Sequence, residues 1–202
     1  MLYQSTVDDS TVHLLRKLQE LPELQQTRLV GGTALALQIG HRKSIDLDLF
    51  GLLQTAPFEL TGLIRKMGSL VVLNNSTLIH SYVLDGVKVD IVNYDYPWLK
   101  EQKVIDGIRM ASLEDIAAMK IMAAVGRGTK KDFIDIAFLL NYFSLGEMLD
   151  FYSSKYPEAS QFMAVKSLAY FEDAEKDIAP FMLKDITWED VKSLIRGELE
   201  KL

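Results

Sequence analysis

The sequence contains no cysteine, and it has only three histidines and five prolines among its 202 residues. Without cysteine the chain can form no disulfide, no thiolate nucleophile and no cysteine-ligated zinc site. The three histidines, His13, His41 and His80, are too widely spaced for a zinc motif. The composition therefore excludes disulfide-stapled folds, cysteine-dependent enzymes and zinc modules of the usual spacing, and it fits a reducing compartment.

Long apolar runs and an excess of basic residues are also absent. No uninterrupted apolar segment is long enough to span a bilayer, and the first residues, MLYQSTVDDS, lack the basic start and apolar core of a signal peptide. We therefore expect a cytoplasmic protein without a membrane partner. The formal charge of −6 argues against general, sequence-independent nucleic-acid binding. Residues 172–202 carry nine acidic and five basic side chains, which leaves room for a local basic groove elsewhere that holds an RNA end.

The chain does have an ordinary globular composition, with 49% hydrophobic and 25% charged residues. Helical and strand patterns alternate before residue 110, whereas only helical periodicity follows it. The pattern predicts an α+β fold in which residues 1–110 form an α/β core. Residues 111–202 are expected to form a helical C-terminal region packed on that core.

Hydrophobic periodicity also places the individual elements. Helices are predicted over Thr6–Glu20, Phe58–Met67, residues 113–125, Asp132–Phe143, and residues 145–155, 158–171 and 188–201. Strands are predicted over Leu70–Leu73, Leu78–Leu84, Val87–Val92 and Ile108–Ala111, with a two-residue hairpin at Asp85-Gly86. Aromatic residues near the last helices are typical of a core, although they could also stack an RNA base: Tyr152, Tyr156, Phe162, Tyr170 and Phe171.

One stretch, LVGGTALALQIGHRKSIDLDLF at residues 29–50, combines a glycine pair with two carboxylates. A short β-favouring segment ends at Gly31-Gly32, and a helix-forming run begins behind Thr33. Glycines between a strand and a helix allow close backbone approach, and free N–H groups at a helix start attract anions. Thr33 can cap the helix or offer its hydroxyl to a phosphate. Glycine turns before helices are common, so the pair indicates a phosphate site only together with further residues.

Those further residues are Asp46 and Asp48. Residues two apart on a strand face the same way, so the two carboxylates share one face, roughly 6–7 Å apart. Ile45, Leu47 and Leu49 are expected on the other face. Two carboxylates together with substrate phosphates suit Mg²⁺. A solvated edge strand with its charges outward would show the same pattern.

A third carboxylate, Asp90, lies in the alternating segment Val87–Val92. If this strand lies beside the strand of Asp46 and Asp48, the three side chains converge. Such a triad can hold two Mg²⁺ ions that activate an attacking hydroxyl and neutralise a departing pyrophosphate.

Together these residues resemble the AbiEii/AbiGii-type nucleotidyltransferases of the polymerase-β-like nucleotidyltransferase superfamily, which include toxins of abortive-infection and toxin–antitoxin systems. The resemblance spans residues 28–140. It rests on the glycine pair with its hydroxyl residue, the motif H-R-x-S-x-D-x-D-x-F at residues 41–50, the Asp90 strand and the later pattern K-x-x-A…R…K-D-x-x-D from Lys120. It implies a nucleotidyltransferase-like mixed β-sheet flanked by helices, two Mg²⁺ ions and an NTP as donor.

The resemblance also implies the site. Catalytic and metal-binding roles fall to Asp46, Asp48 and Asp90, and nucleotide binding falls to Gly31, Gly32, Thr33 and Lys120. The implied acceptor is a hydroxyl of tRNA or another RNA, or of a protein, and a cognate antitoxin is an implied partner. Two other functions compete: nucleotidyl transfer to a small molecule of the antibiotic type, and a non-catalytic nucleotidyltransferase-like binding module.

Several charged residues allow more than one interpretation. Lys120 lies in an otherwise apolar helix, so it either extends to water or contacts the donor's phosphates, as the resemblance implies. Asp135 either pairs locally with Lys131 or orients Lys120 or Lys131 from beneath the site. Asp132 suits a helix start, and the resemblance also implies that it supports the phosphate site together with Arg42, Lys131 and Asp135. Lys131 replaces the arginine of the family pattern and loses its two-pronged grip on phosphate. Arg42 either contacts the triphosphate or offsets local negative charge.

Overall fold

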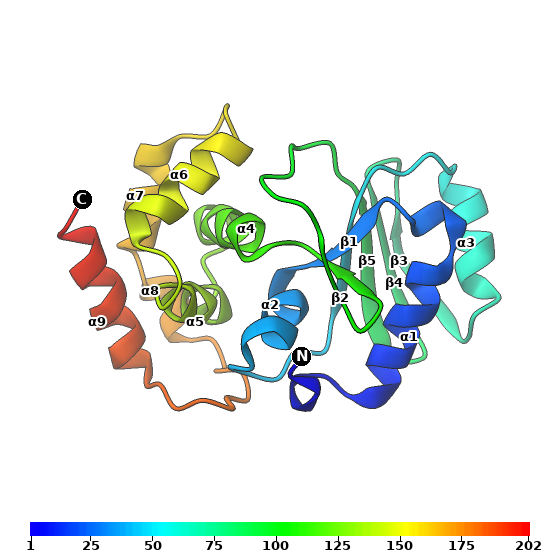
Figure 1. The fold of residues 1–202 in the computed structure, drawn as a ribbon, viewed down its shortest axis with the longest axis horizontal. Coiled ribbons are helices and arrows are strands. Elements are labelled where there is room, and N and C mark those ends of the chain that lie inside the picture. The colour runs from blue at the N-terminus through cyan, green and yellow to red at the C-terminus, as the bar shows by residue number, and fades with distance from the viewer. The chain divides into compact units, whose positions relative to one another are not determined.

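The computed structural model describes residues 1–202 and divides by its internal contacts into two units. Unit 1 comprises Met1–Asp95 and Gln102–Ala111, and unit 2 comprises Tyr96–Glu101 and Ser112–Leu202. Figure 1 shows the elements coloured along the chain. None of the helices combines the length and the apolar character that crossing a membrane requires.

Unit 1 is built on a seven-stranded sheet with the strand order β3-β4-β5-β2-β1-β7-β6. The strands are β1 (Thr27–Val30), β2 (Leu47–Gly51), β3 (Leu70–Asn75), β4 (Ile79–Leu84), β5 (Val87–Asn93), β6 (Lys103–Ile105) and β7 (Ile108–Met110). The helices are η1 (Gln4–Thr6), α1 (Asp9–Glu20), η2 (Pro22–Leu24), α2 (Gly31–Ile39) and α3 (Pro57–Arg65). Because β2 runs antiparallel to β1 but parallel to β5, the sheet is mixed, which confirms the predicted α+β fold.

The two faces of β2 and β5 differ because their side chains alternate. The apolar face is fully buried at Leu47, Leu49, Val89 and Ile91. Helix α3 covers this side, since the hydroxyl of Thr61 and the phenol of Tyr82 on β4 lie 2.9 Å apart (Figure 1). Asp48 and Asp90 therefore project from the opposite face. Ile45, expected with the core, is instead 69% exposed because β2 begins only at Leu47.

Two tight hairpins connect neighbouring strands of the sheet. Asp85 and Gly86 join β4 to β5 with φ angles of 49° and 83°, as the sequence predicts. Asp106 and Gly107 join β6 to β7 in the same way, with φ angles of 51° and 78°. This second hairpin and β6 were not predicted, although Asp-Gly carries the same signal at both places.

Unit 2 is helical, with α4 in contact with α5, α6 and α7 (Figure 1). Its helices are α4 (Leu113–Gly126), α5 (Lys130–Leu139), α6 (Leu145–Lys155), α7 (Gln161–Leu168), α8 (Glu172–Glu175) and α9 (Trp188–Leu199). Ser112 caps α4 by accepting a hydrogen bond from the backbone N–H of Asp115. Helix α5 begins two residues earlier than predicted and α7 is shorter, because Thr129 and Ser160 are their N-caps.

A buried ion pair fastens the connecting segment Tyr96–Glu101 to the helices of unit 2. The ammonium of Lys155 lies 2.7 Å from a carboxylate oxygen of Asp115, and neither side chain is exposed. Asp115 also accepts hydrogen bonds from the backbone N–H groups of Leu99 and Lys100, while Lys155 donates to the carbonyl of Pro97. Asp115 and Lys155 thus each have hydrogen-bond partners in addition to one another.

Aromatic residues of unit 2 divide between core and surface. Tyr152, Tyr156 and Phe171 are buried, in agreement with the core interpretation. Phe162 and Tyr170 are 74% and 50% exposed.

Candidate active site

The glycine pair begins helix α2, and each glycine lies against a charged side chain. Gly31 has a φ of +68°, in the left-handed region that favours glycine, and Val30 is the N-cap. A Cβ at Gly31 would collide with Oδ2 of Asp48, and a Cβ at Gly32 would collide with the guanidinium of Arg42. Gly31 therefore suits its position by its backbone conformation, whereas a side chain at Gly32 would require the guanidinium of Arg42 to shift.

The carboxylates come from two adjacent strands. Strand β5 pairs with β2 in parallel, and the register places Asp90 directly opposite Asp48. Asp46 lies two residues before Asp48, just ahead of β2. The strand arrangement that the metal-site hypothesis requires is therefore present in unit 1, with all three aspartates partly accessible.

A lysine for which the sequence pattern predicted no role lies next to these carboxylates. The ammonium of Lys88 lies 2.6 Å from Oδ2 of Asp90. The hydrogen bond to Asp90 raises the pKa of the Lys88 ammonium, and the charges of Asp46 and Asp48 add to this effect. The period of a strand, which puts residues 88 and 90 on one face, was the signal for this contact.

Polar groups between α2 and β2 hold the carboxylate strand in place. The hydroxyl of Thr33 donates to the backbone carbonyl of Asp46 and lies 2.8 Å from the hydroxyl of Ser44. Thr33 is 1% exposed and does not cap α2, so the capping alternative is wrong. Arg42 is also buried, and it donates to the carbonyl of Lys43. The phosphate roles of Thr33 and Arg42 stay predictions.

The donor set of this site fits a hard divalent cation. All three candidate ligands are carboxylates, which Mg²⁺ prefers. Oδ1 of Asp90 is buried and accepts no hydrogen bond from the protein, so this oxygen is available to bind a cation. No group of three or more histidine, aspartate or glutamate side chains in the structure is close enough together to form a complete metal site. In the protein alone, the cation held at Asp90 is the ammonium of Lys88.

The later motif forms a second charged cluster within unit 2. Lys120 is 4% exposed, and its ammonium lies 3.0 Å from Oδ1 of Asp132 and 2.7 Å from Oδ2 of Asp135. Arg127 grips both oxygens of Asp132, at 2.8 and 3.0 Å. The hydroxyl of Thr129 donates to Asp132 as well, at 2.5 Å. Every charge of the cluster therefore has an opposite charge within hydrogen-bonding distance.

This pairing changes the ionisation of Asp132. Burial alone would raise the pKa of its carboxyl group, but the hydrogen bonds from Arg127 and the positive charge of Lys120 outweigh burial. The pKa therefore lies well below the usual range of an aspartate. Asp132 stays charged at any physiological pH.

The cluster resolves the choice of partner for Asp135. Its carboxylate pairs with Lys120, while Lys131 is exposed on the surface of α5. The nucleotide contact expected of Lys120, and any phosphate contact of Lys131, stay predictions. Arg127 and Thr129 also belong to the cluster. No role was predicted for them, although the motif contains the arginine.

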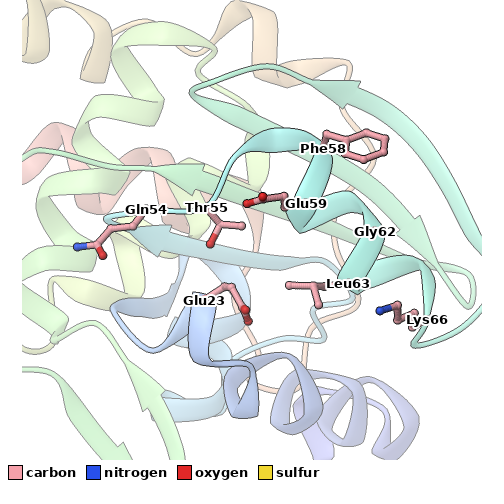
Figure 2. Close-up of a pocket in the computed structure, with 8 residues that line it drawn as sticks. All are labelled: Glu23, Gln54, Thr55, Phe58, Glu59, Gly62, Leu63 and Lys66. Carbon is pink, nitrogen blue, oxygen red and sulfur yellow. The ribbon is translucent and has the colours of Figure 1, made fainter.

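A hollow on unit 1 is separate from these residues. It has a volume of about 500 Å³ and is lined by Glu23, Gln54, Thr55, Phe58, Glu59, Gly62, Leu63 and Lys66. Figure 2 shows these residues on α3 and just after its end, on η2 and on the segment between β2 and α3. None of the candidate site residues lines it.

The fold recurs in solved structures. The crystal structure of JHP933 from Helicobacter pylori matches with a TM-score of 0.57 at 20% identity, covering 96% of this chain and 94% of that chain. The solution structure of the antibiotic-resistance factor ANT(2'')-Ia matches with a TM-score of 0.55 at 15% identity, covering 74% of this chain and 89% of that one. At these identities the likeness concerns the fold.

Sequence comparison identifies relatives and a family. The uncharacterized protein aq_aa25 of Aquifex aeolicus (strain VF5) is 35% identical over 200 residues, which cover 93% of both chains. The family model described as "Nucleotidyl transferase AbiEii toxin, Type IV TA system" matches residues 13–72 and 76–199, which include all the candidate site residues. The chain therefore belongs to the AbiEii family of nucleotidyl transferase toxins and is a nucleotidyltransferase.

Proposed function

We propose that the protein transfers a nucleoside monophosphate from an NTP to a hydroxyl group of an RNA such as tRNA, with Mg²⁺ held by Asp46, Asp48 and Asp90. The observation that carries the proposal is the register that sets Asp48 directly beside Asp90 on parallel strands. Oδ1 of Asp90 supports it, because a buried carboxylate oxygen without a hydrogen-bond partner destabilises the protein unless a ligand binds to it.

The glycine pair supports a phosphate site next to these carboxylates. The packing of Gly31 against Asp48 brings the first turn of α2 to the carboxylates. The N–H groups at a helix start attract anions, so they suit the triphosphate of the donor. Arg42, packed on Gly32, adds a fixed positive charge at the same place.

The reaction is an in-line displacement at the α-phosphorus. The oxygen of the acceptor hydroxyl forms the new bond to phosphorus, the bond from the α-phosphorus to the bridging oxygen breaks, and pyrophosphate leaves with that oxygen. The carboxylate of Asp90 takes the proton of the hydroxyl. A bound divalent cation would neutralise charge on the phosphates. The protein contributes mainly by positioning the reactants and stabilising charge.

The acceptor and the partner are inferred from the family. Because the family is described as toxins of type IV systems, we propose that the protein is a toxin with a cognate antitoxin and that its acceptor is RNA. A protein hydroxyl is the second choice within the same chemistry. Small-molecule acceptors are a third, since ANT(2'')-Ia has been solved with adenylyl-2''-tobramycin and shares the fold, with 16% identity.

The direct test uses each of the four NTPs, labelled at the α-phosphate, with Mg²⁺ and total RNA, total protein or tobramycin as acceptor. Label in RNA that requires Mg²⁺ and is lost in Asp48→Asn is the expected result. Label in protein or tobramycin alone would move the proposal to that acceptor class. Full incorporation by Asp48→Asn would refute the assigned site.

A further inference from the structure

The ammonium group of Lys88 lies among the candidate metal ligands. It lies two residues before Asp90 on β5, so both side chains project from the same face of the sheet. Asp48 stands opposite Asp90 on the neighbouring strand β2, and Asp46 comes just ahead of that strand. Its ammonium is 2.6 Å from Oδ2 of Asp90. The lysine is thus positioned where a divalent cation would meet the carboxylates.

We propose that Lys88 is a resident counter-cation of the carboxylate site, which holds Oδ2 of Asp90 until a divalent cation replaces it and thereby weakens the affinity of the free enzyme for metal. The inference rests on the proposed function, because it needs Asp46, Asp48 and Asp90 to be metal ligands. An ammonium at this place opposes metal binding in two ways: it occupies a ligand oxygen, and its charge repels the incoming ion.

The contacts of Asp90 and Lys88 are those that such an exchange requires. One oxygen of Asp90 is held by Lys88, and the other is buried without a partner. The side chain of Lys88 is 46% exposed, so its flexible stem can swing the ammonium into water when a metal enters. The aspartate then exchanges one cation for another without leaving its strand. In the free enzyme the lysine offsets the mutual repulsion of the carboxylates.

The exchange is tested by measuring metal affinity without nucleotide. Mn²⁺ is titrated into the full chain and the free ion is followed by electron paramagnetic resonance, with Mg²⁺ as competitor. We expect Lys88→Met to bind Mn²⁺ more tightly than the wild type, by a factor on the order of ten. Lys88→Arg keeps the charge and should bind like the wild type. Lys103→Met removes an exposed lysine elsewhere in unit 1 and should also bind like the wild type.

A second readout follows thermal unfolding by circular dichroism, which also shows that each variant is folded. In EDTA, Lys88→Met should melt below the wild type because the carboxylates have lost their counter-charge. With saturating Mg²⁺ the gap should close, since tighter binding gives more stabilisation.

The possible results separate the inference from the proposed function. Equal or weaker Mn²⁺ binding by Lys88→Met overturns the role of Lys88, as does an equally large change in Lys88→Arg. No saturable binding by either the wild type or Lys88→Met overturns the proposed metal site itself.

Discussion

Two aspartates, Asp90 in unit 1 and Asp132 in unit 2, show opposite ways of holding a carboxylate. Both oxygens of Asp132 accept hydrogen bonds, from Lys120, Arg127 and Thr129, and its side chain is fully buried. Asp90 is held by Lys88 through one oxygen only, its other oxygen has no partner, and its side chain is 19% exposed. The oxygens of Asp132 are fully hydrogen-bonded within the protein, whereas one oxygen of Asp90 is available for a ligand.

The difference separates groups that hold the structure from groups that await a substrate or an ion. A buried carboxylate surrounded by cations and hydroxyl groups gains nothing from a further ligand, and removing a partner is costly. A carboxylate with an unused buried oxygen gains from a cation that completes it. By this criterion we expect Asp90 to serve the chemistry and Asp132 to serve the stability of unit 2.

The sharpest way to break this comparison is Asp48→Asn. We expect nucleotidyl transfer to fall by about 10³-fold or more, because several kcal/mol of charge stabilisation depend on the carboxylate site. The melting temperature should not fall, since a like charge beside Asp90 is removed. Activity is followed with labelled NTP and stability by circular dichroism. Asp150→Asn, an exposed aspartate of α6, is the matched control and should change neither.

Lys120→Met tests the opposite side of the comparison. It leaves two buried carboxylates, Asp132 and Asp135, without their shared cation, so we expect a loss of about 3–5 kcal/mol in the free energy of unfolding. Urea titration measures it. Lys131→Met on the exposed side of α5 should stay within about 0.5 kcal/mol.

A stable Lys120→Met protein that has lost NTP binding would contradict this structural account. It would instead support the phosphate contact implied for Lys120 by the family resemblance.

Asp132→Asn sharpens the comparison through pH. The pKa of Asp132 is lowered in the folded protein, so its charge stabilises the fold above the unfolded pKa of about 3.9, and this stabilisation is lost as the pH falls through the folded pKa. At pH 7 we expect the variant to lose about 2–3 kcal/mol. The deficit should shrink progressively below about pH 4.

Denaturant titrations of the wild type and Asp132→Asn between pH 7 and pH 2 measure this trend. A deficit that stays constant over the whole range would show that the charge of Asp132 is not what stabilises the cluster. Asp150→Asn, carried through the same series, controls for the general effect of acid.

The smallest effect is expected from Gly31→Ala. A left-handed φ costs an alanine about 1–2 kcal/mol, and the new methyl group would also push against Asp48. Transfer activity should therefore fall along with stability. Gly62→Ala, where nothing lies near the added carbon in α3, should stabilise by about 0.5–1 kcal/mol. If Gly31→Ala changed neither activity nor stability, the close approach of Asp48 to a glycine backbone would not be required.

Local patterns accounted for much of unit 1. The two-residue period of a strand put Asp48 opposite the apolar face of Leu47 and Leu49, and the Asp-Gly pair at residues 85 and 86 forms the expected hairpin. These features depend on neighbours in the chain. The start of β2 was less predictable. Ile45 is a β-favouring residue in the alternating pattern, but it is exposed because pairing with β5 begins at Leu47.

The choice of charge partners lay beyond local patterns. Asp135 and Lys131 have ideal spacing for a helical ion pair, yet Asp135 pairs with Lys120 on a different helix. The buried Lys120 gains far more from a carboxylate than the solvated Lys131 does, so burial decided the pairing. Burial is a property of the packed helices, which no single segment encodes.

The amino-acid sequence by itself determined the residue types, the faces of the strands and helices, and membership of the AbiEii family. Only the tertiary structure decided that Asp90 stands opposite Asp48, that Lys88 reaches Asp90 and that one oxygen of Asp90 is left without a partner. The physical reason is range. Periodicity and turn chemistry act over a few residues, whereas strand register and the burial of charge are settled by contacts between segments far apart in the chain.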